Sequence, residues 1–254
     1  MSGALTVLFI GPAGVGKSSL VKAYGDWLKS QGIGVARVNL DPAADYVPYE
    51  PDFDARKIVW AREIALKEGL GPNGALIRSI EILCSRVDEV LEAIASFDAD
   101  FVLVDTPGQM ELFVFRDLSL RIVDGLKKVS RGVVGVFVAE ASMLRDPTDY
   151  AFLALICNAI QLRLDIDVVA VVNKVDAVDS VPEGVRTWIE LLQEASKALE
   201  TRGAFGEMMS RILEALTSYS KAMNVPLVSA TKGMGLEELH RIVHEVACSC
   251  GDLT

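Results

Sequence analysis

The sequence predicts an α/β fold whose doubly wound, mainly parallel sheet has about six strands covered by helices. Two observations support this prediction. Short runs rich in valine and isoleucine recur along the chain, and they are apolar throughout rather than alternating, as in strands that are buried on both faces. Segments with helical periodicity separate these runs, and such alternation is typical of a parallel sheet with helices on both faces.

The expected elements follow one another with few interruptions. Strands are expected at residues 4–10, 34–40, 100–107, 132–140, 167–176 and 225–231. Helices are expected at about 17–31, 51–69, 74–97, 109–129, 148–164, 183–201, 204–223 and 235–249. Two intervals exceed what a strand–helix–strand crossover needs. We interpret them as helical insertions, at about 45–98 and 178–223, in a single domain spanning residues 1–254.

Composition narrows the range of partners. The chain carries a formal charge of −10, and 51% of its residues are hydrophobic, which is enough for one large core. Such an acidic surface repels nucleic acids and anionic membranes, so neither is expected as a direct partner. The N-terminal residues contain no basic segment before their short apolar run, and neither a signal peptide nor a membrane span is expected. The four cysteines are therefore expected to be reduced thiols in the cytoplasm.

A complete phosphate-loop motif, G-x-x-x-x-G-K-[ST], follows the first expected strand and opens a helix. Its glycines let the backbone wrap around a phosphate chain, while the N–H groups of residues 13–18 and the helix N-terminus attract the anion. Lys17 is expected to reach the β- and γ-phosphates, and the Ser18 hydroxyl to bind Mg²⁺. A plain glycine-rich turn is the alternative, and the filled motif argues against it. The expected binding residues are Gly11, Pro12, Ala13, Gly14, Val15, Gly16, Lys17, Ser18 and Ser19.

A second motif, Asp-Thr-Pro-Gly-Gln, begins within the strand expected at 100–107 and continues past its end. Asp105 suits a direct or water-mediated role at Mg²⁺, the Gly108 N–H suits a contact with the γ-phosphate, and Gln109 suits the orientation of an attacking water. A strand-end or capping role for Asp105 is the alternative, as is a non-catalytic role for Gln109.

A third motif, Asn-Lys-Val-Asp, ends the strand expected at 167–176. The Asp176 carboxylate can accept hydrogen bonds from the N1–H and N2–H₂ groups of guanine, whereas adenine has an acceptor at N1 and would leave the charge unpaired. Asn173 and Lys174 complete this motif. Residues Ser229, Ala230 and Thr231, at the end of the last expected strand, can support the base oxygen through backbone N–H groups.

The order of these motifs, with "VNLDPA" at 38–43 and Gly-Pro-Asn at 71–73, resembles the GPN-loop GTPases, a family of P-loop GTPases, over nearly the whole chain. The length and the lack of a long acidic tail resemble the single archaeal form more than the tailed eukaryotic member. The family is similar in its core to GTPases that cycle through nucleotide-dependent homodimers. The resemblance therefore implies a homodimer that hydrolyses GTP to GDP and phosphate with Mg²⁺.

The resemblance also implies roles for two further sites. Asp41 is expected near the phosphates, where it holds a Mg²⁺-bound water or helps to orient the nucleophile; a turn-initiating Asp-Pro is the alternative. The loop Gly71, Pro72 and Asn73 is expected to reach in trans into the partner's site, with Asn73 near the γ-phosphate. The implied cellular role is a switch or assembly factor for RNA polymerase or other protein complexes, and the sequence does not identify the client.

Three other functions remain open. A P-loop kinase acting on a small substrate would need an arginine-rich lid, which is not evident. An ATPase of the MinD type would carry an extra lysine early in the phosphate loop, where Pro12 and Ala13 stand. A nucleotide-binding module without turnover is the third. Separately, His240, His244, Cys248 and Cys250 have a spacing compatible with a metal site, but the stretch is more typical of an amphipathic terminal helix.

Overall fold

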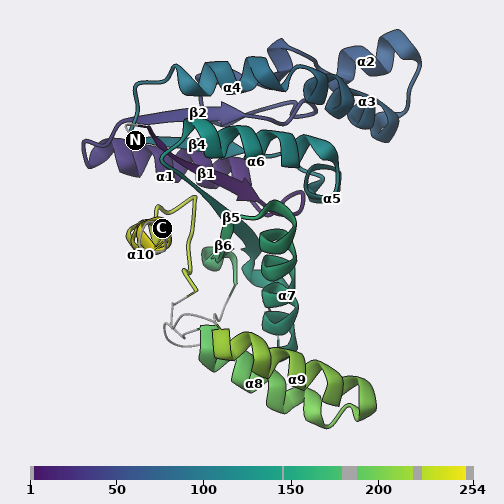
Figure 1. The fold of residues 1–254 in the computed structure, drawn as a ribbon, viewed down its shortest axis with the longest axis vertical. Coiled ribbons are helices and arrows are strands. Elements are labelled where there is room, and N and C mark those ends of the chain that lie inside the picture. Colours follow the sequence, from purple (N-terminus) through teal and green to yellow (C-terminus); the bar gives the residue numbers. More distant parts are fainter. Residues whose placement is uncertain (1–2, 145, 179–187, 220–224, 250–254) are drawn as a thin grey trace.

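The protein is an α/β structure built on one parallel sheet (Figure 1). The computed structural model describes residues 3–144, 146–178, 188–219 and 225–249. The strand order is β3-β2-β4-β1-β5-β6, so the chain starts near the middle and winds outward in both directions. This confirms the predicted doubly wound fold. The strands are β1 (Leu5–Ile10), β2 (Val35–Asn39), β3 (Phe53–Asp54), β4 (Phe101–Asp105), β5 (Gly132–Glu140) and β6 (Asp167–Asn173).

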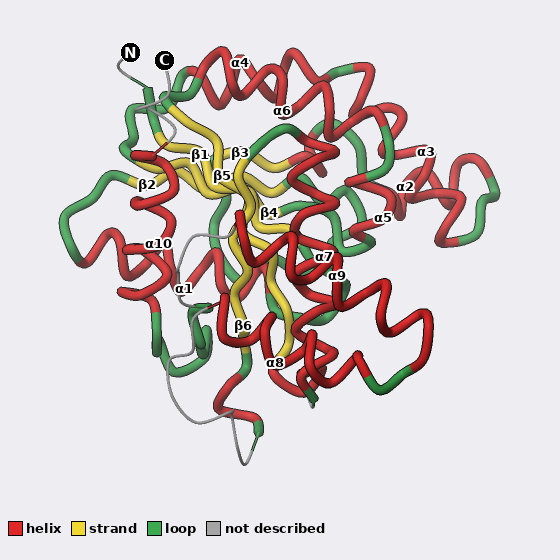
Figure 2. The backbone as a smooth tube through the Cα atoms, turned by 60° about the horizontal axis from the view of Figure 1, so that its bottom comes forward, coloured by secondary structure: helices red, strands yellow, loops and turns green. Residues whose placement is uncertain are grey.

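Helices cover both faces of the sheet, and Figure 2 shows the strands enclosed between them. The α-helices are α1 (Lys17–Ser30), α2 (Ala61–Glu68), α3 (Pro72–Ser85), α4 (Val87–Ala95), α5 (Met110–Val114), α6 (Asp117–Val129), α7 (Pro147–Leu164), α8 (Trp188–Glu200), α9 (Gly203–Tyr219) and α10 (Leu236–Ser249). Single 3₁₀ turns lie at Ala55–Lys57, Ala141–Met143 and Val175–Ala177. Buried side chains of α1 and α10 pack on one face, and those of α3, α4, α6 and α7 pack on the other.

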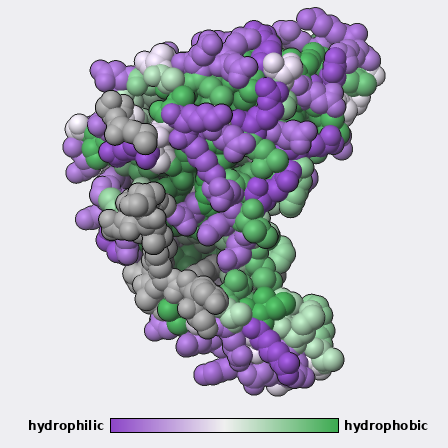
Figure 3. Space-filling model, viewed as in Figure 1, coloured by the Kyte–Doolittle hydropathy of each residue, from purple (hydrophilic) through white to green (hydrophobic). Residues whose placement is uncertain are grey.

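Helices α8 and α9 form a hairpin that projects from the sheet domain beside α7 (Figure 1). A small apolar cluster joins the hairpin to α7 through Ala154 and Leu192. Hydrophobic residues gather on the surface of this region in Figure 3. The exposed large hydrophobic side chains of α9 include those of Phe205, Met208 and Ile212. Among the helices that the structure describes, none combines the length and the hydropathy required to cross a membrane.

The predicted strand at 225–231 is wrong in extent. Only an isolated parallel bridge between Leu227 and Val172 forms there, and Ser229 turns back to pair with Met234. Pro226 explains the short pairing, because it has no N–H group to donate to a ladder. Its carbonyl still accepts a hydrogen bond from the Val172 N–H at 2.9 Å, and the segment therefore stays beside β6.

The region between β2 and β4 also differs from the prediction. The helix expected at about 51–69 contains β3 and a 3₁₀ turn before α2, because Asp52 pairs with β2 through both its backbone and its side chain. The helix expected at about 74–97 is divided at Arg86 into α3 and α4. Helix α3 begins at Pro72, a residue that suits the first helical position because its missing N–H is not needed there.

The two expected insertions correspond to identifiable elements. The interval at about 45–98 holds β3, α2, α3 and α4, and the interval at about 178–223 holds α8 and α9. Residues 179–187 and 220–223 of the second interval lie outside the described part of the chain.

Candidate functional site

The predicted motifs meet at the carboxyl edge of the sheet. The phosphate loop joins β1 to α1, and two of its glycines permit close contacts with neighbouring strands. A Cβ atom on Gly11 would lie 2.5 Å from the carbonyl oxygen of Val138, and one on Gly16 would lie 2.5 Å from Nδ2 of Asn173. Gly16 also has a φ of 91°, a conformation that residues with side chains rarely adopt. The loop therefore packs directly against β5 and the end of β6.

Lys17 is buried and folds back over this loop. Its Nζ donates hydrogen bonds to the carbonyl oxygens of Gly11 at 2.8 Å and Pro12 at 3.0 Å. Burial holds the pKa of Lys17 below its usual value, although the negative charges of Asp105 and Asp41 oppose that shift. An ammonium group confined by the loop and facing two carboxylates is placed to bind a phosphate chain, as the sequence predicts.

Asp105, the last residue of β4, is buried beside the phosphate loop. Its Oδ2 accepts a hydrogen bond from the Tyr49 hydroxyl at 3.2 Å, while its Oδ1 has no partner within the described residues. Burial raises the pKa of Asp105 to about 6, although the nearby Ser18 hydroxyl and the positive charge of Lys17 act to lower it. A buried carboxylate oxygen without a partner is unfavourable on its own, which indicates a ligand of opposite charge or a bound water.

The residues present fit a Mg²⁺ ion. Mg²⁺ prefers oxygen ligands and is usually held by one or two carboxylates together with substrate phosphates and waters. Oδ1 of Asp105, which has no hydrogen-bond partner within the described residues, and the hydroxyl oxygen of Ser18 are ligands of this kind. Asp41, whose negative charge also acts on Asp105, is the third group that the sequence analysis assigns to the metal.

Asp41 follows β2 and connects two loops of the site. Its Oδ2 accepts a hydrogen bond from the Gly108 N–H at 2.9 Å, and its Oδ1 accepts one from the Ala43 N–H at 2.9 Å. The Gly108 N–H, predicted to contact the γ-phosphate, is thus bonded here to a carboxylate, which has similar acceptor oxygens. The contact places Asp41 next to the Asp-Thr-Pro-Gly-Gln segment.

A buried polar network holds the loop that carries Asp41. Asn39 donates from Nδ2 to Asp54 at 2.9 Å, and Arg56 forms an ion pair with the same carboxylate at 2.6 Å. Burial raises the pKa of Asp54, but the hydrogen bonds from Arg56 and Asn39 dominate and keep it below its usual value. Arg56 also donates to the carbonyl oxygen of Ala44 at 3.0 Å. The position of Asp41 is therefore fixed from β3 as well as from β2.

The Gly-Pro-Asn segment forms the start of α3 and is exposed to solvent. Oδ1 of Asn73 lies 3.4 Å from Nε2 of Gln109 in the same chain. The structure thus brings together two residues that the sequence analysis placed in catalysis. The expected action of Asn73 in the partner's site concerns a dimer and stays a prediction.

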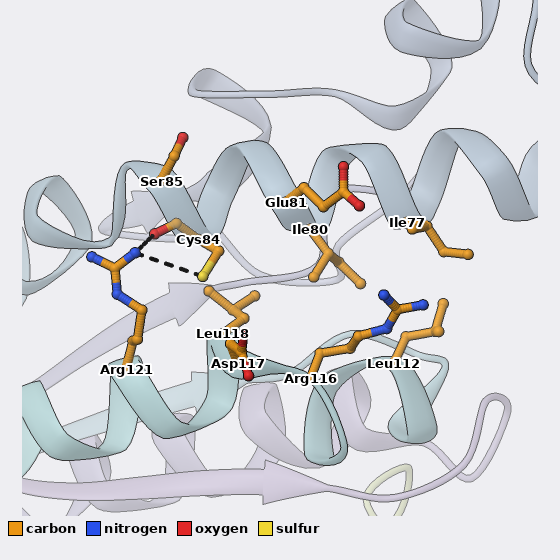
Figure 4. A pocket seen from close by; sticks show the side chains of 10 residues that line it. All are labelled: Ile77, Ile80, Glu81, Cys84, Ser85, Leu112, Arg116, Asp117, Leu118 and Arg121. Carbon is orange, nitrogen blue, oxygen red and sulfur yellow. Dashed lines mark hydrogen bonds between the residues drawn. The ribbon is translucent and has the colours of Figure 1, made fainter.

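A pocket of about 410 Å³ lies between α3 on one side and α5 and α6 on the other (Figure 4). Ile77 and Ile80 of α3 face Leu112 and Leu118 across it. At one end of the pocket, Nη1 of Arg121 donates a hydrogen bond of 2.6 Å to the carbonyl oxygen of Cys84. Because α3 begins with the Gly-Pro-Asn segment and α5 begins after Gln109, these contacts keep Asn73 and Gln109 at the same end of the molecule.

The third motif forms the opposite end of the site. Asn173 donates from Nδ2 to the Val15 carbonyl oxygen at 2.9 Å and accepts from the Ala230 N–H at 3.2 Å. Asp176 accepts from the Thr231 hydroxyl at 3.0 Å. Hydrogen bonds from Ser229 and Thr231 hold the pKa of Asp176 below its usual value, so it is ionised at neutral pH.

A cavity of about 180 Å³ opens between these residues. Its lining combines the phosphate loop with the two predicted base-binding segments: Gly16, Ser19, Asn173, Lys174, Asp176, Ala177, Ala230 and Thr231. Lys174 has a φ of 63°, and its ammonium is paired with Glu140 at 2.8 Å. A larger cavity of about 630 Å³ shares Ser19, Ala230 and Thr231 with it. The cavity therefore has an ionised acceptor, Asp176, in its lining and lies next to the phosphate loop.

The histidines and cysteines of α10 do not form a metal site within the described residues, where no three His, Cys, Asp or Glu side chains gather as ligands. His240 bonds to the Tyr24 hydroxyl at 2.9 Å and packs against the rings of Trp27 and Phe101. Cys248 lies 3.5 Å from Nδ1 of His244, and Cys250 lies outside the described residues. His240 is therefore part of an aromatic core contact.

That contact predicts a pH-dependent stability. Burial, followed by the charge of His244, lowers the pKa of His240 from 6.5. The unfolded chain takes up a proton near pH 6.5 while the folded protein does not, so stability is complete above that pH and is lost as the pH falls below it. The free energy of unfolding, measured with denaturant across a range of about two pH units from pH 7.5 to 5.5, checks this. Part of the loss should disappear in His240→Gln and persist in His244→Gln.

The sequence analysis missed Tyr49, Asn39, Asp54 and Arg56. Tyr49 lies between two prolines, Pro48 and Pro51, just before the helix expected at about 51–69. The paired prolines indicate a rigid extended segment rather than a helix, and they were the available signal.

The fold and the site define a P-loop nucleotide-binding protein of the α/β class. A family model described as a conserved hypothetical ATP-binding protein matches residues 9–249. The GPN-loop GTPase PAB0955 of Pyrococcus abyssi is 34% identical over 98% of this chain and 100% of its own length. GPN-loop GTPase 1 of Dictyostelium discoideum is 29% identical over 92% of this chain and 59% of its own length.

One solved structure agrees with the relatives. The crystal structure of PAB0955, described as a GTPase in apo form from Pyrococcus abyssi, has a TM-score of 0.83 at 31% identity and covers 97% of this chain and 98% of its own. This chain belongs to the GPN-loop GTPase family. The family model is described as an ATP-binding protein, whereas the relatives are named GTPases.

Proposed function

We propose that this protein binds GTP with Mg²⁺ and hydrolyses it to GDP and phosphate, working as a homodimer. One observation supports the proposal most directly: the phosphate loop, the buried Asp105 and the ionised Asp176 converge on one edge of the sheet. These motifs are far apart in the sequence but close together in the fold. A single site that binds both a phosphate chain and the guanosine attached to it needs this arrangement. Membership of the GPN-loop GTPase family gives the same class of reaction.

The roles follow from the contacts. Backbone N–H groups of the phosphate loop and the Lys17 ammonium bind the phosphates. Ser18 and Asp105 would hold Mg²⁺, which supplies positive charge against the phosphate oxygens when bound. Asp41 and Gln109 orient a water molecule. The water oxygen forms a bond to the γ-phosphorus while the bond from that phosphorus to the bridging oxygen breaks, leaving GDP, and the water proton passes to phosphate or solvent.

We assign the Gly-Pro-Asn loop a role in the partner's site within the homodimer. Residues 71–73 are exposed, and α2 and α3 lie at one extremity of the molecule (Figure 1), which supports their reach toward a second copy. The contact between Asn73 and Gln109 of one chain offers the competing arrangement, in which Asn73 acts on its own site. An amide can donate to a phosphate oxygen and accept from water in either arrangement.

Mixing two impaired variants distinguishes action of Asn73 in its own site from action in the partner's site. Lys17→Ala should bind GTP poorly but still carry Asn73. Asn73→Ala should bind GTP but hydrolyse it at a rate lower by about tenfold or more. If Asn73 acts in trans, mixed dimers should regain hydrolysis, because the Asn73→Ala subunit binds GTP and receives Asn73 from its partner. Phosphate release is measured as the mixing ratio changes. Activity that never exceeds the sum of the two variants would reject action in trans, and wild-type speed in Asn73→Ala would reject any role for Asn73.

The competing functions give different outcomes in one assay. Phosphate release from GTP without an acceptor supports hydrolysis, whereas release that requires a small-molecule acceptor indicates a kinase. Clearly tighter ATP binding than GTP binding contradicts the guanine assignment. Binding without phosphate release above background indicates a non-hydrolysing module. Mass measurements in solution with GDP, a non-hydrolysable GTP analogue or no nucleotide test the homodimer and its dependence on nucleotide.

We further propose that nucleotide state switches the dimer between two geometries, and that the cellular output is assembly of a multisubunit complex such as RNA polymerase in the cytoplasm. The proposal rests on family membership and on the placement of the Gly-Pro-Asn loop. Capture experiments with the GDP and GTP-analogue states, compared for polymerase subunits, test it. Equal recovery from both states, or recovery of no polymerase subunit, counts against it.

A further inference from the structure

Tyr49 is a buried tyrosine whose hydroxyl points at the candidate metal side of the site. Its side chain is 7% exposed and belongs to the core beneath α1. Its hydroxyl donates to Oδ2 of Asp105 at 3.2 Å, and Oδ1 of the same carboxylate has no partner within the described residues. The hydroxyl therefore distinguishes the two oxygens of Asp105.

The segment around Tyr49 is held firmly. Pro48 and Pro51 restrict the backbone on both sides of Tyr49-Glu50. Asp52 then joins the segment to β2, since its backbone N–H donates to the Arg37 carbonyl oxygen at 2.8 Å and its carboxylate accepts from the Arg37 N–H at 2.7 Å. These contacts fix the position from which the phenol approaches Asp105.

Arg37 supports the ring itself. Its guanidinium lies 5.9 Å from the centre of the Tyr49 ring and is held by an ion pair with Asp26 and a hydrogen bond to the carbonyl oxygen of Lys22. A cation over an aromatic face attracts it, and the effect is larger away from water. The ring is thus clamped between the core and a buried cation, so the direction of its hydroxyl is defined.

We propose that Tyr49 is a positioning residue for Mg²⁺: its hydroxyl holds Oδ2 of Asp105 and leaves Oδ1 as the oxygen that faces the ion or an ion-bound water. The inference rests on the proposed function, because it assumes that Asp105 serves a metal ion. Residues that bond to metal ligands orient them, and their loss costs about 10–100-fold in metal affinity or activity. Tyr49 therefore acts through Asp105 and does not contact nucleotide.

The test replaces Tyr49 by phenylalanine, which keeps the ring and removes the hydroxyl. The dissociation of a fluorescent GDP analogue is measured over a range of free Mg²⁺ concentrations and in excess EDTA. In Tyr49→Phe the Mg²⁺ concentration for half-maximal slowing should rise by about tenfold or more, while dissociation in EDTA stays as in the wild type. Electron paramagnetic resonance of bound Mn²⁺ should show weakened binding without any turnover. A merely structural role would change the EDTA measurement as well.

Two matched variants serve as controls. Tyr46→Phe changes an exposed tyrosine in the same segment, and Tyr24→Phe removes a buried hydroxyl that bonds to His240 instead. Both should keep the wild-type Mg²⁺ dependence. An unchanged Mg²⁺ dependence in Tyr49→Phe overturns the inference. If the wild type binds no guanine nucleotide, or binds it without regard to Mg²⁺, the proposed function is wrong and the inference falls with it.

A double-mutant comparison tests whether Tyr49 works through Asp105. In an Asp105→Asn background the Tyr49→Phe substitution should cause no further change in Mg²⁺ dependence, and a full additional change would overturn the inference. A fluorine magnetic resonance measurement on the protein that keeps Tyr49 covers the case in which Tyr49→Phe does not fold. With fluorotyrosine at all five tyrosines, the fluorine signal left after the other four are assigned by substitution should shift when Mg²⁺ joins bound GDP. No shift would overturn the inference.

Discussion

Replacing Lys17 by alanine is expected to weaken GTP binding by about a hundredfold to ten-thousandfold. Each hydrogen bond to a charged group contributes about 1.5–3 kcal/mol, and the ammonium is placed to make two such bonds, to the β- and γ-phosphates. At about 1.4 kcal/mol per factor of ten, two bonds account for this range. Calorimetric titration with GTP and GDP measures the effect, and GDP should lose less because it has no γ-phosphate.

The nucleotide-free fold should tolerate this change. Lys17 is a buried cation whose Nζ bonds only to the carbonyl oxygens of Gly11 and Pro12 among the described residues, and burial already disfavours its charged form. Lys22→Ala, a change at an exposed lysine on the same helix, is the matched control and should leave GTP affinity within about twofold. A Lys17→Ala protein that binds GTP normally would remove Lys17 from the site.

The local pattern of the chain predicted those parts of the site that are contiguous in sequence. Gly11 to Ser19 lie between a strand and a helix as the motif requires, and Asp105 ends a buried strand. Because parallel strands end at one edge, Asp105 and Asn173 had to lie near the phosphate loop once the sheet was assigned. The bond between Asn173 and the Val15 carbonyl oxygen is the observed form of that convergence.

The remainder depends on pairings between distant residues, which periodicity does not encode. β3 has two residues, and it forms because Asp52 and Asp54 bond to Arg37 and Asn39 of β2. Tyr49 looked like a loop residue, since nothing in its neighbours shows that its hydroxyl meets Asp105. Conversely, the apolar run at 225–231 suggested a full strand, and Pro226 limits it to a bridge.

The contact of Asp41 with Gly108 shows how two motifs become one unit. The sequence analysis assigned both to the phosphates separately, and the structure joins them by a hydrogen bond of 2.9 Å. A γ-phosphate oxygen that accepts the Gly108 N–H would compete with the Asp41 carboxylate.

Replacing Asp176 by asparagine is expected to lower GTP affinity by about a hundredfold or more and to create a preference for xanthosine triphosphate. The carboxylate accepts from two guanine donors, N1–H and N2–H₂. Losing one bond to a charged group costs about 1.5–3 kcal/mol, and leaving the N2–H₂ donor unpaired costs about 1–3 kcal/mol more. Asparagine still offers one acceptor for N1–H but places an N–H₂ group against N2–H₂. Xanthine has a carbonyl oxygen at that position, so the amide fits it. Competition between the three triphosphates and a fluorescent GDP analogue measures the change.

The surroundings of Asp176 make this prediction specific to the base. Thr231 bonds to the carboxylate at 3.0 Å and Asn173 keeps the neighbouring phosphate loop in place, so asparagine changes the acceptor without removing its support. Asp124→Asn, at an exposed aspartate of α6, is the matched control and should leave the order GTP, xanthosine triphosphate, ATP unchanged. Thr231→Val should weaken GTP by a smaller factor in the same direction, because it frees the carboxylate to turn away. An Asp176→Asn protein with the wild-type ratio of GTP to ATP affinity would show that the base is read elsewhere.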